Sequence, residues 1–523
     1  MMKHKTILIL FYVIAMTSNA IAQYNLDWQQ NANNDSKTSV MSVVDSQDNI
    51  IVTGYLQSFQ IFTRKYDLSG TLLWEAADSS GINSIYEKSN WVSCDSNNNI
   101  YVVGNQYSIS SSYDYPNAIV ALKYNSTGTL IWKTVIPISI LINSTTSFDC
   151  RSVVDASGNL YIGTAITNGA TLFKLDTLGN LIFTSTSSVN APKNFNGMRI
   201  RNNKIAIATS SGSSNVSPVF VWDTSGTLLW SANAVGLLAA DVEIDENENI
   251  YVLGSIYNQI NATTWDYDAK LTKFSPTGNL LWSQSYDFGG YNFTTRMTYL
   301  NNRISAIGYG NSSGINWVTF QTDTSGILLW SSPYTVISNP TYTDEYPHYV
   351  TATPNGEVLV TGVGGPTPIP GSGSYNQMPI VQYSNTGIQN WISTPNMYAG
   401  TGLAVMFASD GSLYAIGSRN LYVFHYNAMS TSTNENSKST DKVKIFPNPF
   451  SASATLSINT DKTYSALIIV YDILGNVVKS LDANNLHNGE NNISLDLNDL
   501  EGGIYFCSVN YNSEIENIKL IKN

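Results

Sequence analysis

Short apolar stretches alternate with polar turns along most of this chain, and the same order of stretches returns at a nearly fixed spacing. One recurring piece is an apolar strand, a polar turn and a second apolar strand, as in the segment VVDSQDNIIVTG at residues 43–54. Apolar, β-branched runs around Asp, Asn and Gly are typical of a β-hairpin. The copies occupy residues 43–54, 95–104, 155–163, 202–209, 245–254, 301–308, 355–362 and 410–417.

A second recurring piece is a Gly followed by three mostly apolar residues and an aromatic residue, as in the segment GTLLW at residues 70–74. Its aromatic residues lie about 46 to 61 residues apart, close to the roughly 40–50 residues of a four-stranded propeller blade. Each repeat therefore predicts four strands. The aromatic positions are Trp74, Trp132, Phe183, Trp230, Trp282, Trp330 and Trp391, with Trp28 as an eighth that lacks its Gly.

The two ends of the repeat array predict how it closes. The first unit begins with only one aromatic strand, Tyr24–Trp28, whereas the last unit, after Trp391, has a hairpin and a third strand but no outer strand. One end completes the other, which removes exposed sheet edges that would template aggregation. We predict an all-β chain with an eight-bladed β-propeller, or a seven-bladed one if the unit around Phe183 is an insertion.

The repeats resemble a family of secreted bacterial β-propeller proteins. The repeat consensus of that family couples a D-x-x-G-N-x-Y-V-x-G hairpin to a K-x-x-x-x-G-x-x-x-W strand pair. Residues 155–163 and 123–132 carry the resemblance, which covers about residues 24–427. It implies the fold and no particular activity.

After Tyr426 the repeat pattern stops. We place the propeller in residues 23–428, and residues 429–442, rich in Ser, Thr, Asn and Lys, are typical of a flexible linker. The remaining segment, 443–523, has short strands separated by Pro-Asn-Pro, Leu-Gly-Asn and Glu-Gly-Gly turns. That pattern predicts a small immunoglobulin-like β-sandwich.

The C-terminal segment carries four motifs in a set order: KIFPNPF from Lys444, VYDILGNVV from Val470, LEGGIYF from Leu500 and IKLIK from Ile518. With them it resembles the type A C-terminal sorting domain of type IX secretion substrates, found in the Bacteroidetes. The resemblance implies contact with the type IX secretion machinery, passage across the outer membrane, and removal of this domain with release or surface attachment. An accessory immunoglobulin-like module is the alternative.

Residues 1–22 have the features of a secretory signal peptide. Lys3 and Lys5 precede an apolar run at residues 6–16, and small residues precede Gln23. The apolar run is too short for a membrane anchor, so no transmembrane segment is expected. We therefore expect export by the Sec route and then by type IX secretion, to the extracellular space or the outer-membrane surface.

Composition narrows the classes of partner. The net charge of −12 would repel a phosphate backbone, so nucleic acid is not an expected partner. Only 12% of the residues are charged, while Tyr, Asn, Ser and Thr abound, which suits a neutral, hydrogen-bonding exterior. Three cysteines are too few for a disulfide framework, and free thiols at Cys94 and Cys150 are favoured over a bridge between them.

Candidate chemistry is sparse, and we assign no catalytic residue, metal site or cofactor. The turns that begin at Asp95 and Asp245 imitate a calcium loop but have Ile where that loop needs Gly, so hairpin turns are favoured. His348, near two acidic residues, is the best candidate base, although a hydrogen-bonded loop histidine is the favoured interpretation. The recurring segment from Gly to Trp also looks similar to the tryptophan-docking repeat of quinoprotein dehydrogenases. The vicinal cysteines and the calcium site of those enzymes are absent from this sequence.

Strand order predicts where ligands bind. In a four-stranded meander the first and third connections lie at one end of the blade, and the second and fourth at the other. The short, uniform turns are all first and third connections, so the long, variable segments share the opposite end, where we place the binding site. The expected ligand-binding residues are Tyr113, Tyr115, Tyr257, Trp265, Tyr267, Tyr346, His348 and Tyr375.

These observations favour a secreted or surface-attached propeller that binds a glycan or a protein, and they favour binding over enzymatic activity. Aromatic loop residues offer flat apolar faces with polar tips to either ligand. A polysaccharide hydrolase or lyase, a quinoprotein-like enzyme and a structural surface spacer are the alternatives. Carboxylates converging at the propeller axis would favour the enzyme, and the lack of any pocket or aromatic cluster would favour the spacer.

Overall fold

The computed structural model divides the chain into two compact units, residues 1–431 and 432–523, which are described separately below. The structure describes residues 24–522 with gaps. The gaps are residues 32–36, 57–59, 83, 109–114, 139–148, 167–168, 188–193, 211–215, 236–237, 260–264, 290–291, 312–314, 335–345, 365–377, 396–399, 429–442, 472–476, 501 and 512–513. The predicted signal peptide and linker therefore lie outside the described residues.

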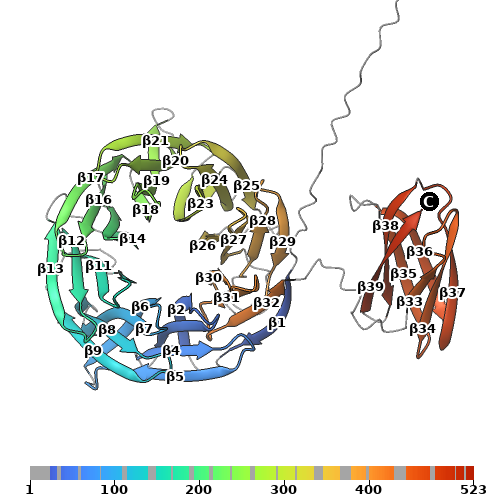
Figure 1. Ribbon diagram of the computed structural model, residues 1–523, viewed down its shortest axis with the longest axis horizontal. Helices are drawn as coiled ribbons and strands as arrows, with labels where there is room; N and C mark the ends of the chain where they lie inside the picture. Colours follow the sequence, from blue (N-terminus) through green and yellow to red (C-terminus); the bar gives the residue numbers. More distant parts are fainter. Residues whose placement is uncertain are drawn as a thin grey trace, which may run out of the picture. The chain divides into compact units, whose positions relative to one another are not determined.

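The first unit is a ring of eight four-stranded antiparallel sheets (Figure 1). Blades one to four contain β2 (Lys37–Val44), β3 (Ile50–Leu56), β4 (Ile61–Tyr66) and β5 (Leu72–Asp78); β6 (Ile85–Cys94), β7 (Ile100–Ser108), β8 (Tyr115–Tyr124) and β9 (Leu130–Pro137); β10 (Cys150–Val154), β11 (Leu160–Ile166), β12 (Gly169–Leu175) and β13 (Leu181–Ser187); and β14 (Asn194–Arg201), β15 (Lys204–Ser210), β16 (Val216–Asp223) and β17 (Leu228–Val235).

Blades five to eight contain β18 (Leu238–Ile244), β19 (Ile250–Gln259), β20 (Trp265–Phe274) and β21 (Leu280–Tyr286); β22 (Phe293–Leu300), β23 (Arg303–Asn311), β24 (Ile315–Asp323) and β25 (Leu328–Tyr334); β26 (Tyr346–Ala352), β27 (Val358–Val363), β28 (Ile380–Tyr383) and β29 (Gln389–Ser393); and β30 (Gly402–Phe407), β31 (Leu413–Gly417), β32 (Val423–Ala428) and β1 (Tyr24–Gln30). In each blade the first of these strands is the innermost (Figure 1).

The ring closes as the sequence predicts. The N-terminal strand β1 pairs antiparallel with β32 and becomes the outer strand of the eighth blade. The unit around Phe183 is a complete sheet, β10 to β13, so it is a blade and not an insertion. The structure therefore has eight blades, and the seven-bladed alternative is excluded.

The recurring Asp fixes the first turn of four blades, at Asp45, Asp95, Asp155 and Asp245. In the Asp155 turn, one carboxylate oxygen accepts hydrogen bonds from the backbone N–H groups of Ser157 and Asn159, at 3.0 and 2.9 Å. The other oxygen accepts from the side chains of Asn159 and Tyr161, at 2.8 and 3.1 Å. These hydrogen bonds hold the pKa of Asp155 below its usual value despite partial burial. Asp95 and Asp245 accept the same backbone hydrogen bonds, so the two calcium-like segments form hairpin turns.

The recurring Gly is a docking point for the aromatic residue of the preceding blade. Gly128, at the third turn of the second blade, has φ = +86°, and a Cβ placed there would lie 2.5 Å from the indole of Trp74. The indole N–H of Trp74 donates to the carbonyl of Ser126 at 3.1 Å. The same packing joins Trp28 to Gly70, Trp132 to Gly179, Phe183 to Gly226, Trp230 to Gly278, Trp282 to Gly326 and Trp330 to Gly387.

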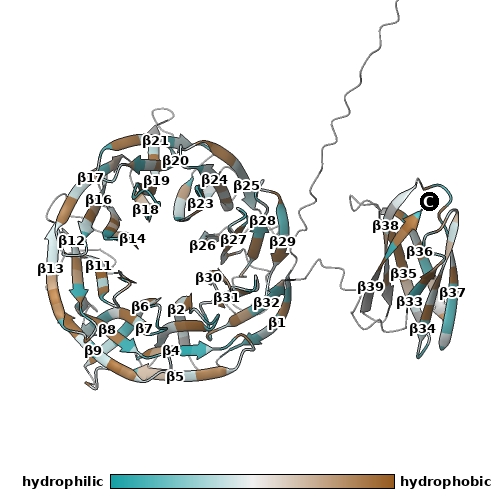
Figure 2. Cartoon of the chain, in the orientation of Figure 1, coloured by the Kyte–Doolittle hydropathy of each residue, from teal (hydrophilic) through white to brown (hydrophobic). Residues whose placement is uncertain are grey.

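Hydrophobic side chains fill the interfaces between successive blades. Each cluster of buried residues draws on two neighbouring blades; the one that contains Met41, Ile51, Val102 and Leu122, for example, joins the first blade to the second. Figure 2 shows hydrophobic segments along the outer strands as well, for example on β13 and β17. These begin with exposed apolar residues, such as Leu181 and Ile182, that flank the docked aromatic.

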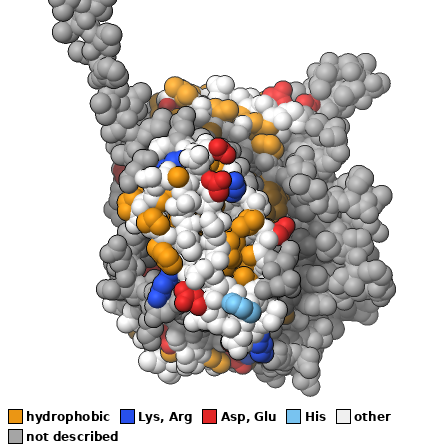
Figure 3. Space-filling model, turned by 90° about the vertical axis from the view of Figure 1, so that its right-hand side faces the viewer, with side chains coloured by type: hydrophobic (Ala, Val, Ile, Leu, Met, Phe, Trp, Pro, Cys, Tyr) orange, Lys and Arg blue, Asp and Glu red, His pale blue; other side chains and the backbone are white. Residues whose placement is uncertain are grey.

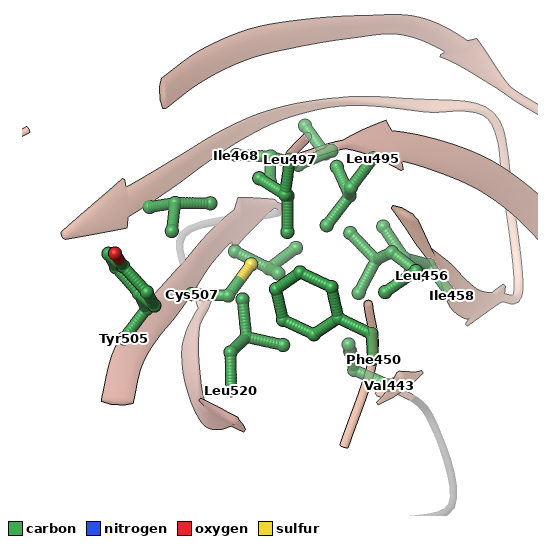
Figure 4. Packing of buried hydrophobic residues seen from close by; sticks show 14 of the residues in the cluster. Val443, Phe450, Leu456, Ile458, Ile468, Leu495, Leu497, Tyr505, Cys507 and Leu520 are labelled. Carbon is green, nitrogen blue, oxygen red and sulfur yellow. The ribbon is translucent and has the colours of Figure 1, made fainter. Parts of the chain in front are cut away.

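The second unit is a β-sandwich. One sheet contains β33 (Val443–Phe446), β34 (Ser453–Thr460) and β37 (Gly489–Asp496). The other contains β35 (Tyr464–Tyr471), β36 (Val477–Leu486), β38 (Gly503–Tyr511) and β39 (Glu514–Lys522). Phe450, Cys507 and Leu520 lie at the centre of the core between the sheets (Figure 4).

We predict that Gly128→Ala destabilises the propeller more than Gly411→Ala does. Both glycines have φ near +85°, but a Cβ at Gly411 would meet no atom within 4 Å. The left-handed conformation alone costs about 1–2 kcal/mol for a non-glycine residue. Overpacking against Trp74 adds about 1–3 kcal/mol to the loss at Gly128 only.

Denaturant unfolding of the two variants measures the difference in the free energy of unfolding. Equal losses would contradict a role for the indole contact in stability.

Candidate functional site

The expected ligand-binding residues fall into three groups. Tyr113 and Tyr375 lie outside the described residues. Tyr115 and Trp265 begin strands β8 and β20 next to second connections, but their side chains lie outside the described part. Tyr257, Tyr267, Tyr346 and His348 are described in full and come from the fifth and seventh blades.

Tyr257, Tyr267 and Tyr346 belong to one row of aromatic rings. The centroids of Tyr257 and Tyr267 are 4.8 Å apart, and Tyr267 lies 4.3 Å from Phe293 of the sixth blade. Phe293 continues to Tyr309 at 5.3 Å, and Tyr309 meets Tyr346 edge to face at 4.7 Å. All five rings are half-buried. We call them the aromatic row; it crosses three blades at the end that carries the variable connections.

A second aromatic group lies at the same end of the first two blades. Tyr86 and Tyr107 stack with centroids 4.8 Å apart. The ammonium group of Lys88 lies 5.2 Å from the ring of Tyr86, 5.5 Å from that of Tyr107 and 5.3 Å from that of Tyr55. The cation thus faces three rings at distances at which cation–π attraction is significant.

His348 occupies a β-bulge in an inner strand. The pairing of β26 with β27 shifts register between Pro347 and Tyr349, so His348 is the inserted residue. Burial and the positive charge of Arg296 lower the pKa of His348 to about 4. The imidazole is therefore neutral at neutral pH. The acidic neighbours that the sequence offers, Asp344 and Glu345, lie outside the described residues.

The bulge recurs around the ring and re-aims side chains. Seven of the eight inner strands, as far as they are described, show the register shift; β10 is the exception. The residues that follow the shift, or match that position in β10, are Met41, Trp91, Arg151, Gly197, Asp241, Arg296, Tyr349 and Ala404. Five blades, the second, third, fifth, sixth and seventh, therefore have a charged or aromatic side chain at this position of the inner strand.

A cavity of about 310 Å³ lies among the inner strands. Six blades contribute to its wall, from β6, β10, β14, β18, β22 and β26, so it lies on the axis of the ring. We call it the axial cavity. Its wall includes Trp91, Arg199, Glu243, Arg296, Met297 and Tyr349.

Two acidic side chains of β18 are paired with arginines; Glu243 and Arg199 line the cavity, whereas Asp241 and Arg151 do not. Arg199 lies 2.8 Å from Glu243 and 3.5 Å from Asp241, and Arg151 lies 3.6 Å from Asp241. The side chain of Asp241 is fully buried. Burial, opposed by the charge of Arg199, raises the pKa of Glu243 to about 7. Glu243 can therefore hold or release a proton near neutral pH.

Arg151 and Arg296 share one aromatic neighbour. The guanidinium carbon of Arg151 lies 4.8 Å from the centre of the Trp91 ring, and that of Arg296 lies 5.5 Å from it. Arg296 also lies 5.8 Å from the ring of Tyr349. Within the described residues Arg296 has no hydrogen bond or ion pair to a carboxylate, and the Nη1 atom of Arg151 has no hydrogen-bond partner.

Three carboxylates gather at the variable end of the fifth blade. Oxygen atoms of Asp266, Asp268 and Asp287 lie within 4.8 Å of one another, close in sequence to Tyr267 of the aromatic row. Exposed acidic groups are common without a cation, and this grouping alone assigns no metal.

The motifs of the last eighty residues match a known family model, the secretion system C-terminal sorting domain, over residues 444–523. Residues 444–523 are a type IX secretion sorting domain. The protein is therefore secreted to the cell surface or beyond. Among the residues that the structure describes, no helix is long and apolar enough to cross a membrane.

Solved structures similar to the chain show low identity. The "Dos1 propeller" is 10% identical with a TM-score of 0.49, covering 77% of this chain and 95% of its own. Kuenenia stuttgartiensis hydrazine synthase is 12% identical with a TM-score of 0.41, covering 64% and 94%. A protein of unknown function from Bacteroides caccae is 11% identical with a TM-score of 0.31, covering 69% and 94%. The sequence has no significant match among curated proteins.

The sequence did not lead us to the axial cavity. Its charged residues come from blades about fifty residues apart and look like ordinary polar positions of inner strands. One signal was available in the blades whose first turn has five residues. The position four residues before that turn is occupied by Trp91, Arg151, Asp241 and Tyr349 in four of them. Comparing that position across the repeats would have revealed the ring of large side chains.

Proposed function

We propose that this propeller is a secreted or surface-attached binding module whose ligand, a glycan or a protein, lies on the end that carries the variable connections. The aromatic row is the single observation that supports this most. Five half-buried rings in contact across three blades present flat apolar faces with polar tips. The polar tips are those of the four tyrosines, since Phe293 has none. Such faces suit sugar rings, and they also occur at protein interfaces.

The surface favours a glycan over a protein as the ligand. Figure 3 faces the side on which Figure 1 draws the C-terminal unit, and its side chains there are mostly uncharged, with scattered hydrophobic groups. The whole chain has only 12% charged residues. A neutral exterior rich in hydroxyl and amide groups suits a ligand that is itself covered with hydroxyl groups.

Two features argue against a purely structural spacer. A spacer needs neither a pocket nor an aromatic cluster, and this ring has both the axial cavity and the aromatic row. In a binding module, by contrast, a rigid scaffold holds such groups for a ligand.

A polysaccharide hydrolase or lyase is the second candidate, because Glu243 has a pKa of about 7 in a cavity. General acid–base catalysis needs a pKa near the working pH. Among the described residues Glu243 is the only carboxylate in the cavity wall, and Arg199 pairs with it at 2.8 Å. A glycoside hydrolase usually needs two carboxylates facing the sugar, so we favour binding. Incubation with acidic and neutral polysaccharides, followed by product analysis, separates the two functions.

We expect Tyr267→Ala and Tyr346→Ala to weaken ligand binding, each by about 2 kcal/mol or more if the row is the centre of the interface. Glycan-array and surface-protein capture with the full chain identify the ligand, and calorimetry measures the two variants. Asp176→Ala, in an exposed turn at the opposite end, is the control and should leave affinity unchanged. Loss of binding in the control alone would place the ligand at the short turns.

We expect a chain that ends at Asp441 to stay in the periplasm with its propeller folded. The sorting domain spans residues 444–523 and has its own hydrophobic core, so its removal takes away the export signal without opening the ring. Fractionation of a host that has type IX secretion, with protease resistance as the test of folding, measures this outcome. Display of the truncated chain at the cell surface would contradict it.

A further inference from the structure

The axial cavity has more positive than negative charge. Its wall contains two guanidinium groups, of Arg199 and Arg296, and one carboxylate, that of Glu243. Arg151 and Asp241 are not part of the wall, but they contact its residues. Arg199 contacts both acidic residues, and Arg151 is within ion-pair distance of Asp241 only. The charge of Arg296 is therefore the one left without a carboxylate partner among the described residues.

The charge of Arg296 lowers the pKa values of two neighbouring residues. Burial and then the charge of Arg296 lower the pKa of Arg151 to about 9, and they lower the pKa of His348 to about 4. These two residues lie on β10 and β26, on different sides of the cavity. A partly buried cation that repels two neighbours is costly unless an anion joins it.

Aromatic rings hold the guanidinium groups by their faces. Arg296 lies over Trp91 and Tyr349, and Arg151 lies over Trp91. A guanidinium group that lies over a ring can still donate its N–H groups to an acceptor. Such N–H groups in a fixed fork match the two oxygens of a carboxylate or a sulfate.

We propose that the axial cavity binds an acidic sugar unit, with its oxyanion paired to Arg296 and its ring against Trp91 or Tyr349. The cavity volume of about 310 Å³ is at the lower end of the roughly 300–1,000 Å³ typical of small-molecule sites, which suits one sugar ring. This inference rests on the proposed glycan-binding function and names its ligand class.

The aromatic row connects the variable end to the cavity along two inner strands. Phe293 and Arg296 are three residues apart on β22, and Tyr346 and Tyr349 are three residues apart on β26. Each pair spans a β-bulge and lies opposite positions only two residues apart on the neighbouring strand, a separation of roughly 7 Å. A glycan bound at the row therefore reaches Arg296 if its next unit turns from the row along β22.

The test measures binding of three monosaccharides to the full chain by calorimetry: galacturonate, galactose 6-sulfate and galactose. We expect the carboxylate, the sulfate ester or both to bind, and the neutral sugar to bind at least tenfold more weakly. Binding of only one of the two acidic sugars tells which oxyanion the site takes. Failure of both, or equal binding of all three, overturns the inference.

Arg296→Gln isolates the residue that carries the argument. Loss of a charge-assisted, bidentate contact should weaken binding of the acidic sugar about 10- to 100-fold. The variant should melt at the same temperature as the parent protein or higher, because the substitution removes repulsion with Arg151. Arg201→Gln is the matched control, since Arg201 pairs with Glu246 at 3.0 Å outside the cavity wall.

Unchanged affinity in Arg296→Gln, or an equal loss in Arg201→Gln, overturns the inference. The outcome is distinct from failure of the proposed function. If Tyr267→Ala weakens glycan binding while Arg296→Gln does not, the aromatic row binds the glycan and the axial cavity has no part in it. If Tyr267→Ala also leaves binding unchanged, the proposed function fails as well.

Discussion

The contact between an indole and a glycine of the next blade is the interaction on which the ring depends. The Gly at the third turn has positive φ and no Cβ, and the aromatic ring of the preceding outer strand fills the space that a Cβ would occupy. Gly70 receives the ring of Trp28 from the N-terminal strand, so the same contact that spaces the blades also closes the circle. In this way a short recurring segment, from the Gly to the aromatic residue, determines that the blades form a closed ring.

A ring built in this way has two different ends. At the end with the short turns, polar groups hydrogen-bond to one another within each turn. The carboxylate of Asp155, for example, accepts hydrogen bonds from two backbone N–H groups and two side chains. The opposite end carries the connections that vary and the aromatic row. Between them, the bulged inner strands bring Trp91, Arg296 and Tyr349 to the axis. Stability and recognition are thus located in different layers of the same blades.

The repeat pattern predicts the eight blades, the closure by Tyr24–Trp28 and the sandwich after residue 442, because each depends on local strand and turn signals that recur. It also led to Tyr257, Tyr267 and Tyr346, since antiparallel order alone tells which connections share an end. Phe293 and Tyr309, which join these residues into one row, were missed because they lie outside the long variable segments of the sequence. The three tyrosines themselves lie in strands β19, β20 and β26 and not in loops, as we had expected. The axial cavity was missed because its residues are brought together only by closure of the ring.

The most direct measurement is a crystal structure of the full chain with galacturonate, because it locates the acidic group. We predict the sugar in the axial cavity, with its carboxylate oxygens about 2.7–2.9 Å from the guanidinium nitrogens of Arg296. Its ring should lie against Trp91 or Tyr349. A cavity that stays empty at a concentration that saturates binding in solution, with the sugar bound elsewhere, would contradict the assignment of this site.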